Sequence, residues 1–326
     1  MFTLIQYVLK RIGILLLTLL ILVTVLFFLL QLLPGSPFNN PKFSETQILA
    51  LENKYGLNEP LFMQYLQYLK NFVTGDLGES FQRLGTPVTK ILITPLKYTS
   101  ELVVYTTIVG VVIGLFLGSL AAIYKDKFVD TIATIVAILG VSLPSFVIAT
   151  IIVLFLMWTQ SEFGSALFPI TLNVNTDNYF ERLHSYIAPV IALSFFFIAS
   201  LLRYMRSELV DVLESDYILL ARSKGLNNKE IILRHGFRNA LIPVVTVIGP
   251  LMVSLLGGST FVERFFGVPG LANALINSIN TLDYFVIMGI ALFYSVLYMV
   301  VMLVIDVSYG LIDPRIRLAG GSHGKK

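Results

Sequence analysis

The chain has 326 residues, of which 56% are hydrophobic and 13% charged, and its formal net charge is +3. Soluble domains carry about 25% charged residues, so this composition excludes an ordinary soluble protein. The chain has no cysteine, which excludes disulfides and cysteine-ligated metal sites. We also expect no nucleic-acid partner.

Six long uncharged segments predict six transmembrane helices. They cover residues 12–33, 102–124, 131–161, 185–202, 240–262 and 284–305. A helix needs roughly 20 apolar residues to cross a bilayer core, and these segments are near or above that length. Because they are continuous rather than alternating, we expect an all-α integral membrane protein and not a barrel. The first segment is too long for a cleaved signal peptide, so it is interpreted as a retained helix.

Basic residues predict the orientation of these helices. With both termini in the cytoplasm, most Lys and Arg residues lie inside, and the short outer loops carry only Arg182 and Arg264. The predicted organisation has four parts. They are an N-terminal segment with the first helix (1–33), an extracytoplasmic helical loop (34–96), a five-helix transmembrane core (97–318) with a cytoplasmic loop at 203–239, and a cytoplasmic tail (319–326).

Residues 34–96 have the patterns of a folded loop. Ser44 and Gln47 have the spacing of a capping box, and Gly56 is placed to end the helix that follows. A second helix is predicted from apolar residues on one face, which are Leu61, Tyr65, Tyr68, Leu69 and Phe72. Two interpretations remain open: a cap packed on the helical bundle, or a contact surface for an extracytoplasmic substrate-binding protein.

Glycine and proline mark special points within the spans. Gly110, Gly114 and Gly118 repeat at four-residue spacing, which predicts close packing against another helix. Pro144 predicts a bend in the third span. Pro243, Gly249, Pro250, Gly257 and Gly258 lie in the fifth span and predict a bent helix beside a translocation pathway. The acidic Asp306 in the last span is interpreted as a structural partner near the interface.

The most informative segment is the basic stretch from residue 215 to residue 243. It contains Arg222, Lys224, Lys229, Arg234 and Arg238, and its pattern predicts a helix, a break at Gly225 and a second helix. Asn227 or Asn228 is placed to cap the second helix, which has an apolar stripe of Ile231, Ile232 and Phe237. The acidic residues just before it, Glu208, Asp211, Glu214 and Asp216, are interpreted as a solvated face or as partners of basic residues.

Here the sequence resembles the permease subunits of ABC importers, and within them the B subunits of oligopeptide and dipeptide permeases. A-R-S-K-G-L at 221–226 and L-R-H-x-x-R-N-A-L-I-P at 233–243 are similar to the cytoplasmic coupling loop of that family. L-P-G-S-P at 33–37, K-Y-G-L-N-E-P at 54–60, G-D-L-G-E-S at 75–80 and L-I-D-P-R-I-R-L at 311–318 are also similar. The chain departs from the family at 219–221, where Leu-Leu-Ala replaces Glu-Ala-Ala, so the contact made by that glutamate is not carried over.

The resemblance implies a type I ABC importer permease fold with six transmembrane helices. It implies a heterodimer with a second homologous permease, two ATPase subunits that bind ATP and Mg, and an extracytoplasmic substrate-binding protein. The residues expected to couple this chain to an ATPase are Ala221, Arg222, Ser223, Lys224, Gly225, Leu226 and Glu230. The expected cargo is a peptide, with a nickel–chelator complex, glutathione or another small solute as the alternative. The expected location is the cytoplasmic membrane of a bacterium or archaeon.

We expect no catalytic, cofactor-binding or metal site in this chain. The sequence lacks G-x-x-x-x-G-K-S/T, so no P-loop for ATP is predicted, and it lacks H-E-x-x-H and G-x-S-x-G. An ion-coupled secondary transporter is a less favoured alternative, because it would need buried ionisable residues and usually inverted repeats.

Overall fold

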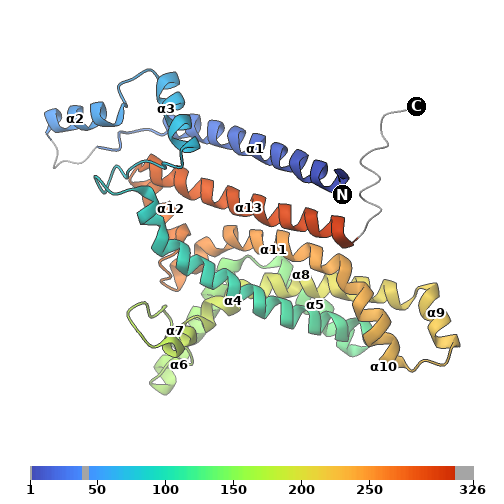
Figure 1. Ribbon diagram of the computed structural model, residues 1–326. Helices are drawn as coiled ribbons and strands as arrows, with labels where there is room; N and C mark the ends of the chain where they lie inside the picture. Colours follow the sequence, from blue (N-terminus) through green and yellow to red (C-terminus); the bar gives the residue numbers. More distant parts are fainter. Residues whose placement is uncertain (1, 39–43, 313–326) are drawn as a thin grey trace. The chain divides into compact units, whose positions relative to one another are not determined.

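The computed structural model describes residues 2–38 and 44–312, and side chains within 8–38 and 44–305. Its described residues are mainly helical (Figure 1), and among them only an isolated bridge between Glu79 and Pro87 has extended pairing. The C-terminal motif beyond residue 312, the predicted tail and the side chain of Asp306 lie outside the described residues. The first helices are α1 (Phe2–Gln31), α2 (Glu45–Tyr55), α3 (Leu61–Val73), α4 (Val88–Ile123), α5 (Phe128–Ser142), α6 (Ser145–Phe163) and α7 (Tyr179–Ser185). The others are α8 (Ile187–Leu213), α9 (Asp216–Ser223), α10 (Asn228–Glu230), the π-helix η1 (Ile231–Phe237), α11 (Arg238–Phe265), α12 (Leu271–Asn280) and α13 (Tyr284–Ile312).

The chain forms two compact units, which are described separately. The first unit comprises Met1–Tyr98 and Pro269–Leu303, and the second comprises Thr99–Val268 and Val304–Lys326. Helices α4 and α13 contribute to both.

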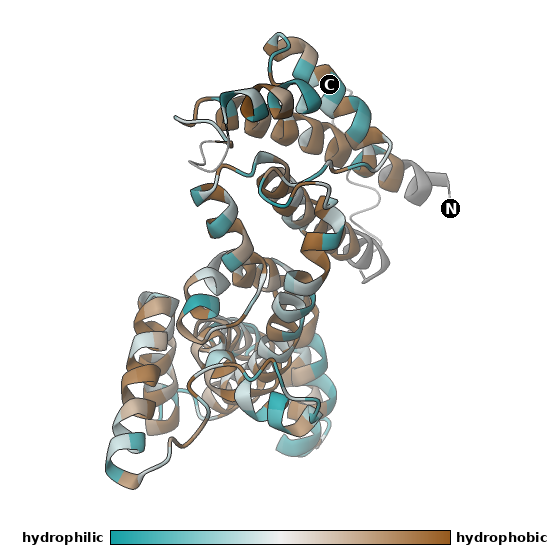
Figure 2. Ribbon diagram, turned by 90° about the vertical axis from the view of Figure 1, so that its left-hand side faces the viewer, coloured by the Kyte–Doolittle hydropathy of each residue, from teal (hydrophilic) through white to brown (hydrophobic). Residues whose placement is uncertain are grey.

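The prediction of six membrane-spanning helices is confirmed among the described residues. The candidate spans are Val8–Gln31, Val88–Ile123, Ser145–Phe163, Ile187–Leu213, Asn228–Phe265 and Tyr284–Ile305. Figure 2 shows these long helices mainly in the hydrophobic colour, with hydrophilic residues toward helix ends and connecting segments. Such surfaces fit a hydrocarbon environment, in which a helix satisfies its own backbone hydrogen bonds.

The third uncharged segment differs from the prediction of one bent helix. It breaks into α5 and α6, with Leu143 in an extended conformation and Pro144 at the start of α6. Proline lacks a backbone N–H and disfavours helical geometry in the residue before it, which permits the helix to end there. Only α6 of the two is long enough to be a candidate span by itself.

The glycine repeat in α4 packs closely against α8 in the second unit, as predicted. A Cβ atom added at Gly114 would lie 2.8 Å from the Cβ atom of Leu201. At Gly118 it would lie 2.6 Å from the carbonyl oxygen of Leu202. Small residues let helices approach closely where apolar lipid removes the hydrophobic drive for association.

The first unit confirms the local signals predicted for residues 34–96, the loop that is expected to lie outside. Ser44 and Gln47 form a capping box at the start of α2, and Gly56 adopts a left-handed conformation, with φ of 69°, at its end. Helix α3 buries Tyr68 against α1 and α13, in a core that includes Phe27 and Met288. Tyr65 also contacts α1, because its hydroxyl hydrogen-bonds to Thr24 at 2.7 Å.

Candidate functional site

The basic segment forms a bent structure that we call the elbow, defined as residues 215–239 of the second unit. Helix α9 begins after Ser215 and ends at Ser223, and Gly225 then takes a φ of 81°. Glycine adopts this left-handed conformation without the steric cost that a Cβ atom brings to most residues, which explains the glycine. The chain then re-enters helix at Asn228 and continues through η1 into α11 (Figure 1).

The turn is closed by local hydrogen bonds on both sides of Gly225. The Gly225 N–H donates to the carbonyl of Arg222 at 2.9 Å, and the Leu226 N–H donates to that of Ala221 at 3.3 Å. The side chain of Asn227 caps the next helix by accepting from the Glu230 N–H at 2.8 Å. Asn227, rather than Asn228, is therefore the capping residue.

A small apolar core holds the two arms of the elbow together. It consists of Ile218 and Ala221 from α9 and Ile231 from η1, with Leu213 and Leu226 packed around them. Ile218 and Ile231 are each only 1% exposed. Burying an aliphatic side chain stabilises a fold by about 1.5–3 kcal/mol, so this core gives the elbow a defined shape.

The structure divides the seven predicted coupling residues into two groups. Arg222, Ser223, Lys224 and Gly225 are exposed around the turn. Ala221 is buried in the elbow core, while Leu226 and Glu230 are partly buried. The first group is accessible to a partner protein, and the second maintains the geometry that presents it.

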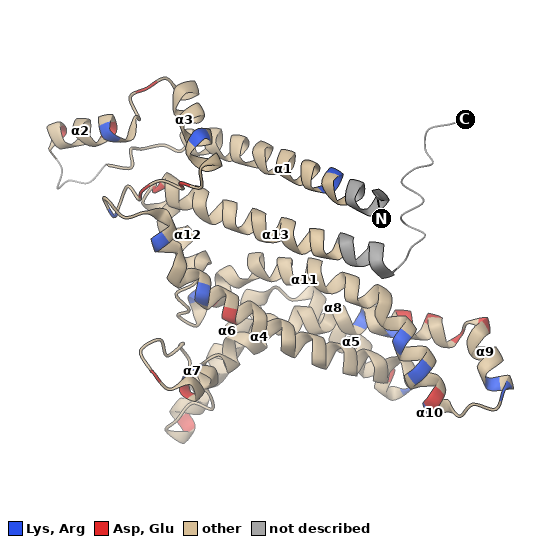
Figure 3. Cartoon of the chain, in the orientation of Figure 1, with Lys and Arg blue, Asp and Glu red and all other residues tan. Residues whose placement is uncertain are grey.

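Exposed leucines on the elbow were not identified as site residues from the sequence. Leu219, Leu220 and Leu233 have exposed fractions of 64%, 56% and 58%. Figure 3 shows charged residues around α9 and α10, whereas the long helices of the same unit are largely uncharged. Exposed apolar side chains rimmed by charged ones are typical of a protein-interaction surface. The sequence could have identified Leu219 and Leu220, because they lie on the opposite side of an amphipathic helix from Ile218 and Ala221, which are buried.

The second arm contains a π-helix that the sequence did not predict. It spans seven residues, Ile231–Phe237, and continues directly into α11. Gly236 lies within it and is buried, and an added Cβ atom would lie 3.2 Å from side-chain atoms of Leu209 and Leu213. π-helical turns are rare and occur often at functional sites, so this segment is a candidate hinge between the elbow and α11.

Two ion pairs link residues around the start of α5 to α8 and to Glu214, the residue after α8. Lys125 pairs with Glu214, which directly precedes the elbow. The hydrogen bond to Glu214 raises the pKa of Lys125. Arg206 makes a two-pronged contact with Asp130, with Nε–Oδ1 and Nη2–Oδ2 distances of 2.5 and 2.7 Å. Glu214, one of the four acidic residues predicted as a solvated face or as partners of basic residues, thus pairs with a basic residue.

No group of three or more His, Cys, Asp or Glu residues suited to a metal ion occurs among the described residues. The arrangement at the elbow instead offers an exposed, basic and partly apolar surface on a rigid core. Its chemistry is that of protein recognition.

Comparison with known proteins agrees with this geometry. Residues 110–318 match the family described as "Binding-protein-dependent transport system inner membrane component". Residues 4–111 match its N-terminal family. The chain belongs to this family.

Several characterised members of the family are similar over nearly their whole length. The chain is 41% identical to the dipeptide transport system permease protein DppB of Lactococcus lactis over 96% of this chain and 100% of that protein. It is 37% identical to DppB of Bacillus subtilis, over 96% of this chain and 98% of that protein. It is 36% identical to the oligopeptide transport system permease protein AppB of Bacillus subtilis, over 89% and 92% of the two chains.

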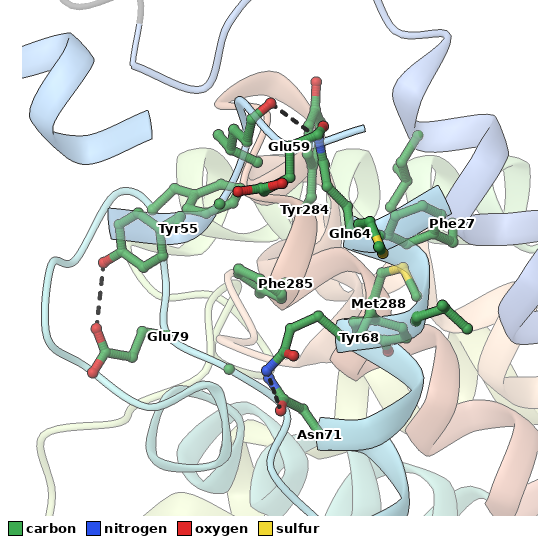
Figure 4. Close-up of a pocket in the computed structure, with 18 of the residues that line it drawn as sticks. Phe27, Tyr55, Glu59, Gln64, Tyr68, Asn71, Glu79, Tyr284, Phe285 and Met288 are labelled. Carbon is green, nitrogen blue, oxygen red and sulfur yellow. Dashed lines mark hydrogen bonds between the residues drawn. The ribbon is translucent and has the colours of Figure 1, made fainter. Parts of the chain in front are cut away.

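The N-terminal family match includes residues 34–96, which together with α1 and α13 line a cavity of about 790 Å³. Figure 4 shows Tyr68, Phe285 and Met288 in its apolar wall, with Tyr55 and Glu79 hydrogen-bonded at its edge. Burial raises the pKa of Tyr68. The hydrogen bond to Glu79 raises the pKa of Lys54, and the two side chains form an ion pair at 3.1 Å.

Proposed function

We propose that this chain is the permease subunit of an ATP-driven importer of peptides, in which it forms the translocation pathway with a second permease subunit. The observation that carries this proposal is the 41% identity, over 96% of the chain, to a protein named as a dipeptide transport permease. Three other relatives are named for dipeptides or oligopeptides as well, which favours peptide cargo over a nickel–chelator complex or glutathione.

The elbow is proposed to dock into an ATPase subunit in the cytoplasm. Because it lies between the fourth and fifth of six spans, both termini of the chain must then be cytoplasmic as well. The support is its exposed basic turn, its exposed leucines and its internal apolar core. The shared apolar core ties the two arms of the elbow together, so a displacement applied at Ser223 or Lys224 would pass to α8 and, through η1, to α11. Two ATPases, each with ATP and Mg, would supply that displacement, and rigid-body motion would alternate access to the pathway.

The outer loop is proposed to receive the extracytoplasmic substrate-binding protein. Its support is the folded helical pair α2 and α3, in which α3 packs on α1 through Tyr65 and Tyr68, and the cavity beside them. A loop with its own core and hydrogen-bonded caps holds a fixed shape, as a docking surface requires.

Uptake in a deletion strain tests the proposed function. Cells that lack this chain are expected to stop accumulating a labelled dipeptide, and the restored gene is expected to return uptake. Depletion of ATP should stop uptake, whereas an uncoupler applied while ATP is maintained should not. Uptake that stops with the uncoupler alone would instead support an ion-coupled transporter.

A further inference from the structure

A second cavity in the first unit, of about 560 Å³, has a different chemistry from the cavity in Figure 4. Its wall includes Arg83 from the loop before α4, Lys90 from the first turn of α4, and Asn277 from α12. The size lies within the range of roughly 300–1,000 Å³ that is usual for small-molecule sites.

Both basic side chains lack an acidic partner within the part of the chain that the structure describes. The described ion pairs join Lys54 to Glu79, Lys125 to Glu214, Arg182 to Glu101 and Arg206 to Asp130. Arg83 and Lys90 are exposed and appear in none of these pairs. Two cations at one cavity attract an anion, and arginine in particular favours a carboxylate through paired N–H donors.

The single carboxylate among the lining residues, Asp283, forms none of the described ion pairs with Arg83 or Lys90. Asp283 is 3% exposed and accepts hydrogen bonds from the Ser80 hydroxyl and from the Phe81 N–H. The distance from the Phe81 nitrogen to its oxygen is 3.1 Å. These hydrogen bonds hold the carboxylate against the loop at Ser80 and Phe81.

Ser80 also takes part in the hydrogen bonds that fix the backbone of Arg83. The Ser80 hydroxyl oxygen accepts from the Arg83 N–H at 2.9 Å, and the Thr86 N–H donates to the Arg83 carbonyl at the same distance. The side chain of Gln82 donates to the carbonyl of Thr281 at 2.7 Å, next to α12. These bonds order the loop backbone from which the exposed Arg83 side chain extends, so less backbone entropy is lost on binding a ligand.

We propose that this cavity binds a carboxylate, specifically the C-terminal carboxylate of the peptide cargo, with Arg83 and Lys90 as its cationic contacts. This inference depends on the proposed function, since every unmodified linear peptide carries that group. Asn277 and Thr94 lie on the same wall and have the polar groups needed to hydrogen-bond a terminal peptide unit.

The test compares two labelled tripeptides, one with a free C-terminal carboxylate and one with a C-terminal amide, in cells that carry the complete transporter. Arg83→Gln with Lys90→Gln should lower uptake of the free peptide about tenfold below saturation, and uptake of the amide should not change. Lys97→Gln is the matched control, because Lys97 is an exposed lysine of α4 that does not line the cavity. Arg83→Lys with Lys90→Arg should retain most uptake of the free peptide.

Photolabelling provides a second measurement, which also applies if the amide is not imported. A peptide with benzoylphenylalanine at its C-terminus should label residues near the cavity in the wild-type transporter. An excess of free peptide, but not of amide, should suppress this label, and the double glutamine variant should lose it. Equal labelling of the double variant would overturn the proposal.

Two other outcomes are informative. One distinguishes a carboxylate of the peptide from a carboxylate of the binding protein, and the other distinguishes failure of this inference from failure of the proposed function. If the double variant lowers uptake of both peptides equally and releases the binding protein from immobilised transporter, then Arg83 and Lys90 contact that protein. The peptide site would then be wrong. If wild-type cells import neither peptide, the proposed function itself fails.

Discussion

Asp130 and Arg206 form a two-pronged ion pair that joins the first turn of α5 to α8. The Asp130 side chain is 6% exposed and that of Arg206 is 30% exposed. The Asp126 N–H also donates to Asp130, at 2.9 Å. Because α8 leads into the elbow, this pair helps to fix one end of the proposed coupling surface.

Removing one partner of this pair should destabilise the permease. Arg206→Gln leaves the buried Asp130 carboxylate without its main partner, and loss of a partner in a buried pair costs about 3–5 kcal/mol. Partial exposure of Arg206 should bring the cost to the lower end of that range. The measurement is the temperature at which half of the detergent-purified transporter aggregates.

The double variant Asp130→Asn with Arg206→Gln provides the control for that experiment. It removes both charges, so it should recover part of the stability lost in Arg206→Gln. A double variant whose loss equals the sum of the two single losses would show that the pair is not coupled.

A graded series at Gly225 should separate backbone geometry from side-chain size. Gly225→Pro should abolish peptide uptake, because proline fixes φ near −65° and removes the N–H that donates to Arg222. Gly225→Asn should retain most uptake, since asparagine tolerates the left-handed conformation, and Gly225→Ala should be intermediate. Uptake of a labelled dipeptide is measured after immunoblotting confirms equal amounts in the membrane.

Space around Gly225 does not limit this series, because an added Cβ atom would meet no atom within 4 Å. Normal uptake by Gly225→Pro would therefore be incompatible with a coupling role for this turn.

The close approach of α4 and α8 predicts a stability loss from a single methyl group. In Gly118→Ala the added Cβ atom would lie 2.6 Å from the Leu202 carbonyl oxygen, so a helix must move. Overpacking of this kind costs about 1–3 kcal/mol, and the aggregation temperature should fall. Gly258→Ala is the matched control, because its Cβ atom would meet its nearest neighbour at 3.7 Å. If Gly118→Ala and Gly258→Ala had the same aggregation temperature, α4 and α8 would not be tightly packed.

The buried carboxylate of Asp283 should be required for order in the loop that contains Arg83. Asp283→Ala removes the acceptor for the Ser80 hydroxyl and the Phe81 N–H, which then lose their partner in a buried setting. We expect faster proteolysis near Arg83 in the purified transporter. Asp76→Ala is a suitable comparison, because Asp76 caps the nearby Gly78 N–H at an exposed position. Identical cleavage rates for the two variants would contradict this role.

Features set by short stretches of sequence were predictable. The Ser44–Gln47 capping box, the left-handed Gly225 and the cap by an asparagine at the next helix depend on residues within a few positions of one another. Continuous apolar segments likewise predicted the membrane helices, because bilayer thickness alone sets their length.

Features that depend on distant contacts were not predictable. Whether Pro144 bends a helix or ends it depends on how both halves pack: Gly140 lies against Ala199, and Ser145 donates to the carbonyl of Gly258 at 3.2 Å. The cationic cavity depends on a hydrogen bond between Ser80 and Asp283, which are far apart in the sequence. The π-helix depends on how Gly236 fits against Leu209 and Leu213.

The most direct test of the account is a single-cysteine crosslink from the elbow to an ATPase, since the chain contains no cysteine of its own. Ser223→Cys places a thiol on the exposed turn, and Ser165→Cys places one in the exposed loop after α6 as a control. In membranes with the complete transporter, we predict that Ser223→Cys crosslinks to a subunit that hydrolyses ATP and that Ser165→Cys does not. If Ser223→Cys captures no such subunit while the assembled transporter still imports peptide, the elbow is not the coupling surface.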